Sequence, residues 1–164
     1  MNKIEIIYGN EKCFESFYEG LTIVARERIY IEMVEPPSFE KFVEYQQDLI
    51  EKKYPVYYAI KNEQVVGWCD VVPEKNPRKC HRGGLAMGLI PDCRRIGIGT
   101  KLLTKSISHS KQCGFEKIEL HVYTTNTSAI ALYKNFGFEQ EGIIRSYRKL
   151  DGDYFDCLAM GLFL

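Results

Sequence analysis

The stretch Gly88-Leu-Ile-Pro-Asp-Cys-Arg-Arg-Ile-Gly-Ile-Gly-Thr-Lys-Leu-Leu103 joins the end of a strand to the start of a helix. Pro91 ends the strand, because proline has no N–H to donate to a neighbouring strand. Before it, apolar residues alternate with smaller ones as in a half-buried strand: Leu85, Met87 and Leu89. After it, apolar residues recur at helical spacing: Ile98, Leu102, Leu103 and Ile107. The sequence predicts a strand, a turn and an amphipathic helix in direct succession.

The turn carries the chemistry of an anion site, through Arg94, Arg95, Gly97 and Gly99. Glycines let the backbone bend sharply and leave its N–H groups uncovered by side chains. Free amides at a helix N-terminus, beside two guanidiniums, favour an anion such as phosphate. Two common phosphate motifs do not fit: Gly99 is not followed by the Lys-Ser/Thr of a Walker A loop, and the third glycine of a dinucleotide fingerprint is replaced by Leu102.

Composition limits the classes of function. The chain has 164 residues with 22 basic and 22 acidic side chains, so we expect one domain over residues 1–164 and no general attraction to nucleic acid or membranes. The start of the chain lacks the apolar run of a signal peptide, and no stretch has membrane-spanning length. Six cysteines occur without a C-x-x-C pair, which argues against a metal site and a disulfide framework. We therefore expect a cytoplasmic protein.

The remaining segments predict an α/β fold with one mixed sheet. Strands are expected at residues 3–8, 56–60, 65–72, 117–123, 139–147 and 154–162, in addition to the strand before the turn. Helices are expected at residues 11–28, 38–53 and from Thr127 or Asn126 to Asn135, in addition to the helix after the turn. The order of these elements argues for helices on both faces of the sheet.

A second motif lies in residues 120–138, with the pattern Asn126-x-x-Ala129-Ile130-x-Leu132-Tyr133-x-x-Phe136-Gly137-Phe138. Together with Arg94-x-x-Gly97-x-Gly99, in this order and spacing, it resembles the acetyl-CoA site of the GNAT superfamily of N-acetyltransferases. The resemblance covers about residue 65 to the C-terminus. It implies a mostly antiparallel sheet of about six to seven strands, splayed between the strand that ends near Ile90 and the strand Lys117–Tyr123.

The resemblance also implies roles for individual residues. The backbone N–H of Met87 would stabilise negative charge on the thioester oxygen, and Tyr133 would protonate the leaving CoA thiolate. An alternative for Tyr133 is packing on an apolar helix face. The resemblance also implies which residues contact the pantetheine arm and the pyrophosphate of acetyl-CoA: Leu89, Ile90, Arg94, Arg95, Ile96, Gly97, Ile98, Gly99, Thr100 and Asn126.

The general base is left open by the sequence. Several relatives carry a glutamate where this chain has Gly83-Gly84-Leu85, so the candidates are His81, His121, Asp70, Glu32 or water. Without a dedicated base, α-amino acceptors are favoured, because their pKa is about 8 and roughly a tenth is neutral at pH 7. Segment 27–35 places acids beside aromatics, which suits either a cationic amine or a solvated loop.

We therefore expect an acyltransferase that moves an acetyl group from acetyl-CoA to a primary amine of a small molecule or amino acid by direct transfer. One alternative is acetylation of a protein N-terminus, which needs an open groove. Another is a non-catalytic sensor that binds acyl-CoA. The apolar and aromatic residues of the last two strands suit either a core or a homodimer interface, and the sequence leaves both open.

Overall fold

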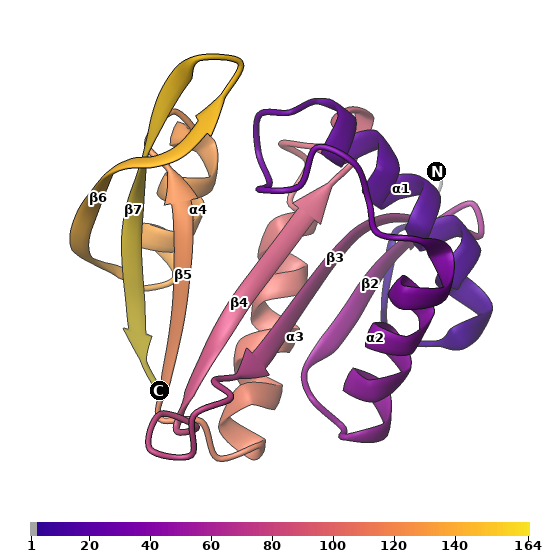
Figure 1. Ribbon diagram of the computed structural model, residues 1–164. Coiled ribbons are helices and arrows are strands. Elements are labelled where there is room, and N and C mark those ends of the chain that lie inside the picture. Colours follow the sequence, from indigo (N-terminus) through magenta and orange to yellow (C-terminus); the bar gives the residue numbers. More distant parts are fainter. Residues whose placement is uncertain (1–2) are drawn as a thin grey trace.

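The computed structural model describes residues 3–164 and contains one seven-stranded sheet in the order β1-β2-β3-β4-β5-β7-β6 (Figure 1). All neighbouring strands are antiparallel except β4 and β5. The strands are β1 Glu5–Tyr8, β2 Val56–Lys61, β3 Gln64–Pro73, β4 Arg82–Leu89, β5 Lys117–Tyr123, β6 Glu139–Leu150 and β7 Asp153–Phe163. The helices are α1 Phe14–Arg26, α2 Phe39–Glu51, α3 Ile98–Gln112 and α4 Thr127–Asn135, with 3-10 turns η1 Glu11–Cys13 and η2 Pro91–Cys93.

The N-terminal ends of the helices follow from local side-chain chemistry. Ser38 precedes α2, and its hydroxyl accepts the N–H of Lys41 at 3.5 Å. Asn10 accepts the N–H of Lys12 at 3.0 Å, but it caps the 3-10 turn η1 rather than an α-helix. The helix predicted from residue 11 therefore begins three residues later, at Phe14.

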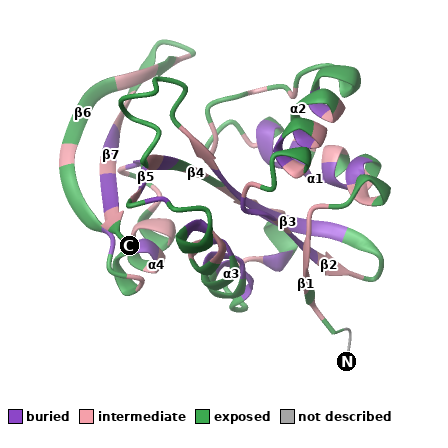
Figure 2. Cartoon of the chain, turned by 90° about the horizontal axis from the view of Figure 1, so that it is seen from below, coloured by how far each residue is buried: buried purple, intermediate pink, exposed green. Residues whose placement is uncertain are grey.

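The two faces of the sheet are covered by different helices, so the core is divided into two clusters. Figure 2 shows α1 and α2 on one face and α3 and α4 on the other, with buried residues turned toward the sheet. The α1/α2 cluster is rich in aromatic rings, including Phe17 and Trp68 with centroids 5.0 Å apart. The α3/α4 cluster is mainly aliphatic and includes Leu102, Leu103 and Ile118. The predicted layers are therefore confirmed.

The sheet splits between its fourth and fifth strands. β4 and β5 pair in parallel only over Arg82–Gly84 and Lys117–Glu119, although β3 stays paired with β4 as far as Leu89. In Figure 1 the two strands meet near the C-terminus and diverge upward, with α3 behind the opening. The backbone of β4 beyond Gly84 consequently has a partner strand on one edge only. This splay is the one expected between the strand near Ile90 and Lys117–Tyr123.

The helices of residues 3–164 are too short or too polar to cross a membrane: none of them offers the length of apolar surface that a bilayer requires.

Candidate active site

The turn between β4 and α3 exposes backbone N–H groups. Arg95 and Gly97 both have positive φ angles, 61° and 82°, which turn successive N–H groups toward one side of the chain. Gly97 is the N-cap of α3 and makes no side-chain cap hydrogen bond. Because the first N–H groups of a helix lack carbonyl partners within it, those of Ile98, Gly99 and Thr100 are available for a ligand. This turn has the properties of an anion site.

The side chains of this turn do not all face the site. Arg94 donates through Nη1 to Glu27 Oε1 at 2.8 Å and through Nε to the carbonyl of Leu89 at 3.0 Å, so its guanidinium is engaged within the protein. Arg94 also lines the cavity considered below, so its expected contact with the phosphates stays a prediction. Arg95 forms no ion pair with any described residue and lines the cavity considered below. The side chain of Ile96 is 55% exposed, whereas that of Ile98 is buried in the core.

The free edge of β4 presents alternate backbone groups to the opening of the sheet. The N–H of Ile90 donates to the carbonyl of Val66 on β3 at 3.0 Å. Since successive residues of a strand point their N–H groups to opposite edges, those of Met87 and Leu89 point away from β3, toward the gap. The expectation that the Ile90 amide faces the pantetheine arm is therefore wrong, because β3 already uses that amide. The expected orientation of Met87 and Leu89 agrees with the backbone alternation.

Helix α4 brings Tyr133 to the other wall of the gap. Its side chain is 6% exposed and packs on Phe138, with ring centroids 5.6 Å apart. Burial, with a smaller contribution from Cys69, raises the pKa of Tyr133, so the hydroxyl stays protonated at neutral pH. Tyr133 lines the same cavity as Met87, and its hydroxyl makes no hydrogen bond to another described residue. The position suits a proton donor.

Asn126 begins α4 and also faces the cavity. Its Oδ1 accepts the N–H of Ala129 at 3.3 Å, so Asn126 rather than Thr127 is the N-cap. The cap fixes the side chain and leaves Nδ2 as the group that can reach a ligand.

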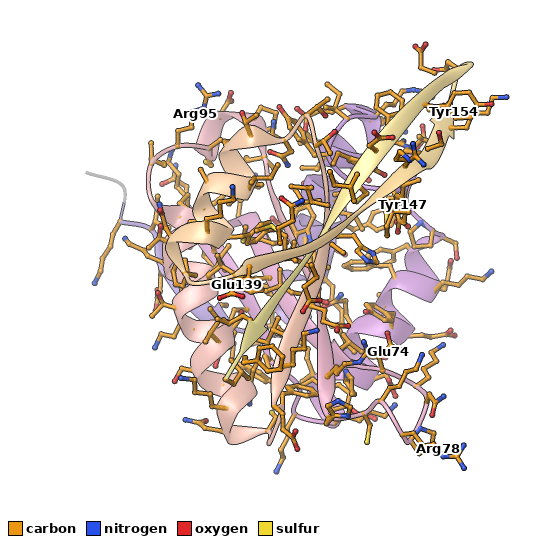
Figure 3. The ribbon with its side chains drawn as sticks, turned by 90° about the vertical axis from the view of Figure 1, so that its left-hand side faces the viewer. Glu74, Arg78, Arg95, Glu139, Tyr147 and Tyr154 are labelled. Carbon is orange, nitrogen blue, oxygen red and sulfur yellow. The ribbon has the colours of Figure 1, made fainter. Side chains whose placement is uncertain are left out.

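These groups line one cavity of about 760 Å³. One end of it is formed by the turn and by the N-terminal part of α3, through Arg94, Arg95, Gly97, Gly99 and Thr100. Its other end is formed by the α1–α2 segment, β5 and β6, through Tyr30, Glu32, His121 and Tyr147. Figure 3 shows Arg95 at one edge of the molecule and Tyr147 and Glu74 on the opposite side. The cavity therefore passes through the sheet between its two faces, and Met87 and Tyr133 lie along it.

The cavity separates the base candidates into two groups. Glu32 and His121 line it, and Glu32 accepts a hydrogen bond from the hydroxyl of Tyr147. Tyr147 also packs against His121, with ring centroids 5.5 Å apart. In contrast, His81 lies in the β3–β4 loop and Asp70 is buried in β3, and neither lines the cavity.

Two further carboxylates line the cavity that the sequence did not indicate, Glu74 and Glu119. Glu119 lies on β5 opposite Gly84, where the strands begin to diverge. Burial acts to raise its pKa, but the hydrogen bonds and charges of Lys117 and Arg82 outweigh burial and hold the pKa below its usual value. Both partners lie 2.8 Å from Oε1, so Glu119 is a neutralised anion. The alternating charges of Lys117 and Glu119 were the sequence feature that could have indicated a charged side chain at this position of the strand.

Three contacts join the α1–α2 segment to the β6–β7 hairpin across the far end of the cavity. Arg28 pairs with Asp151 at 2.6 Å, and Arg148 donates to the backbone carbonyl of Arg28 at 3.2 Å. The third is the Tyr147–Glu32 hydrogen bond. We refer to these three contacts as the bridge. It links the two segments that carry Glu32 and Tyr147, which both line this end of the cavity.

The two sequence motifs predicted the fold of an acyltransferase, in which a mixed sheet splays next to the N-terminus of a helix. The structure has this splay beside the N-terminus of α3. Residues 21–138 match the family described as Acetyltransferase (GNAT) family. The chain belongs to this family, and the expected enzyme class, an N-acetyltransferase, is confirmed.

The chain is similar to relatives with different acceptors in their names. It is 24% identical over 162 residues to L-amino acid N-acetyltransferase AaaT of Escherichia coli strain K12, covering 98% of both chains. It is 33% identical over 106 residues to N-alpha-acetyltransferase 50 of Danio rerio, which is 63% of this chain. That match spans 62% of the Danio rerio protein, less than two thirds of its length.

Among solved structures, the fold is similar to that of yncA from Salmonella typhimurium, determined with its cofactor acetyl-CoA. The TM-score is 0.92 at 17% sequence identity, and the match covers 99% of this chain and 94% of that one. A likeness at this identity confirms the fold.

Proposed function

We propose that this chain transfers the acetyl group of acetyl-CoA directly to the primary amine of a small molecule or amino acid. The observation that carries the proposal is one cavity that joins the turn before α3, the free edge of β4, Tyr133 and the end beside Glu32. A ligand that fills it would hold its phosphates at one end and its reactive group near Met87. Acetyl-CoA has this order of groups.

The donor fits the backbone of the turn and of β4. The amides from Arg95 to Thr100 would hold the pyrophosphate, with Arg95 as the accompanying cation. The gap-facing groups of Met87 and Leu89 would pair with the extended pantetheine arm, as a missing strand would. Asn126 Nδ2 would contact the same arm or the incoming amine.

The reaction then requires one attack and one departure. The neutral amine nitrogen forms a bond to the thioester carbonyl carbon, and negative charge moves to the oxygen beside the Met87 N–H. The tetrahedral intermediate collapses, the carbon–sulfur bond breaks, and the sulfur takes the electron pair. Tyr133 donates a proton to the thiolate, while the nitrogen loses its extra proton to a base or water. The products are the acetylated amine and CoA.

An acyl-enzyme route through a cysteine is disfavoured by the cavity. Cys157 lines it, but burial, with a smaller contribution from Glu32, raises the pKa of the thiol to about 11. A neutral thiol is a poor nucleophile at pH 7, so direct attack by the amine is favoured. Glu32 and His121 are the base candidates placed in the cavity, and an α-amino acceptor can also release its proton to water.

The bridge favours a small acceptor. Its three contacts join the segments on either side of this end of the cavity, whereas a protein N-terminus needs a passage there for the chain that follows it. The Escherichia coli relative, named as an L-amino acid N-acetyltransferase, supports the same acceptor class. The Danio rerio relative, named as an N-alpha-acetyltransferase, supports acetylation of a protein N-terminus as the second candidate.

The test is CoA release by the purified protein with acetyl-CoA and a panel of free amino acids, polyamines and peptide N-termini. We expect release with a small amine and a decrease in kcat of about a hundredfold in Tyr133→Phe, the lower range for loss of a general acid. Tyr154→Phe, whose ring is 61% exposed, is the matched control and should retain kcat.

Other outcomes have defined meanings. Release with peptides only would establish the N-terminal alternative. Tight acetyl-CoA binding without release for any amine would establish a sensor. Full activity of Tyr133→Phe would reduce Tyr133 to a packing residue against Phe138.

A further inference from the structure

Arg94 is held by four contacts inside the protein, although its loop is the proposed phosphate site. Two of its nitrogens donate to the two carboxylate oxygens of Glu27, and Nε donates to the carbonyl of Leu89 at 3.0 Å. Its Cζ lies 4.5 Å from the centroid of the Tyr30 ring. This bidentate geometry fixes the orientation of both partners as well as their separation. Arg94 therefore links the turn before α3 to the end of α1 and to the segment that follows α1.

The segments that it joins serve opposite ends of the cavity. Glu27 is the C-cap of α1, and the chain leads from it through Tyr30 to Glu32 at the acceptor end. Arg94 is followed directly by the amides that begin the donor end. The two side chains of the pair are only 25% and 21% exposed, so water competes weakly for the contact. Glu27 does not itself line the cavity.

We infer that the Glu27–Arg94 pair is a positioning device that couples acetyl-CoA binding to placement of the acceptor segment 27–33. This inference rests on the proposed function, because it assigns the two ends to the donor and the acceptor. When bound phosphates order the turn that follows Arg94, the Glu27–Arg94 pair also orders the segment that carries Tyr30 and Glu32. Coupling of binding free energies is reciprocal, so a bound acceptor also favours the ordered donor turn.

The decisive variant is Glu27→Gln, which keeps the size of the side chain and removes its charge. We expect the KM for the acceptor to rise about five- to tenfold, within the usual range of coupling between two sites. We expect the Kd for acetyl-CoA to stay equal or fall, because the released guanidinium of Arg94 remains beside the phosphate turn. A merely structural role would lower the active fraction, and hence kcat, without changing the acceptor KM.

The chain offers a matched control for this substitution. Arg26 and Glu35 also pair the end of α1 with the following segment, at 3.3 Å, but both side chains are 64% exposed. Glu35 does not line the cavity, so Glu35→Gln should leave both KM values unchanged.

A second variant separates coupling from phosphate binding. Arg94→Lys keeps the charge but loses the bidentate fork, so it should raise the acceptor KM as Glu27→Gln does. The double variant Glu27→Gln/Arg94→Lys should then raise the KM by less than the product of the two single effects. If Arg94→Lys weakens acetyl-CoA alone and Glu27→Gln changes no acceptor constant, Arg94 is only a phosphate ligand and the coupling is refuted.

Hydrogen exchange distinguishes failure of the coupling from failure of the proposed function. In the wild type, acetyl-CoA should slow exchange of the amides of residues 28–33, and in Glu27→Gln this protection should be lost. Protection without CoA release for any amine would overturn the proposed function and retain the coupling. CoA release without this protection would retain the proposed function and overturn the coupling.

Discussion

Asp70 is an acid in the middle of β3 with 7% of its surface exposed, and it forms no ion pair with any described residue. Burial raises its pKa to about 7, against about 3.9 in an unfolded chain. Between these values the folded protein holds a proton that the unfolded chain has lost. Stability therefore decreases as the pH rises from about 4 to 7 and stays at the lower level above pH 7.

We predict that Asp70→Asn stabilises the protein at pH 8, because the amide has a similar shape and no charge to bury. The free energy of unfolding should rise by about 2 to 4 kcal/mol at pH 8, with the difference vanishing near pH 4. Urea unfolding across this pH range measures it, with the exposed Asp153→Asn as control. Because Asp70 does not line the cavity, activity should be retained, and a folded but inactive Asp70→Asn would restore Asp70 as the base.

Individual site residues were predictable to different degrees, and the reason is the range of the interactions involved. The positions of Met87 and Tyr133 follow from short motifs, because a strand edge and one helix face determine them. The sequence does not reveal that Ile90 donates to Val66. Backbone N–H groups alternate between the two edges of a strand, but the sequence does not show which residues point to which edge. It also does not reveal that Arg94 pairs with Glu27, because those residues are 67 positions apart.

The N-terminus of α3 depends on Gly97, whose φ is 82° and whose missing Cβ would meet no atom within 4 Å. We predict that Gly97→Ala costs about 1 to 2 kcal/mol of stability through backbone strain alone. It should also weaken acetyl-CoA binding, because the strained turn no longer aligns its free N–H groups. Titration calorimetry with acetyl-CoA and thermal unfolding measure the two effects.

Gly114, at the other end of the same helix, provides the control. Its φ is 80° and its missing Cβ also meets nothing within 4 Å, but it does not line the cavity. Gly114→Ala should therefore lose similar stability without weakening acetyl-CoA binding. Equal loss of binding in both variants would mean that the turn has no specific role.

The elements themselves were largely predictable from periodicity and caps. Each strand and helix expected from the sequence is present, because alternation in strands and helical spacing in α1, α2 and α3 coincide with the burial that the sheet imposes. The boundaries that shift have local causes. The first turn of the expected helix at residue 11 is η1, and β6 continues to Leu150 through an irregularity around Ser146, whose φ is 51°.

The two halves of the molecule, separated by the splay, meet again at the bridge. Arg28 and Asp151 are 123 positions apart, and Glu32 and Tyr147 are 115 positions apart. No local pattern indicates such contacts, so the sequence could not decide between an enclosed pocket and an open groove. The Arg28–Asp151 pair is well exposed, at 44% and 72%, and we expect it to contribute little to stability. Its consequence lies in what can enter the cavity.

We therefore predict that removing two of the three bridge contacts changes acceptor choice more than stability. In Tyr147→Phe/Asp151→Asn, the ratio of kcat/KM for a peptide N-terminus to that for the free amino acid should rise about tenfold, equivalent to about 1.4 kcal/mol. The Tm should change little, because both lost contacts are at the surface. Tyr154→Phe on the same hairpin is the control, since its ring is 61% exposed and outside the bridge. An unchanged ratio would mean that the bridge does not select the acceptor, and the acceptor size would then be determined by the residues inside the cavity.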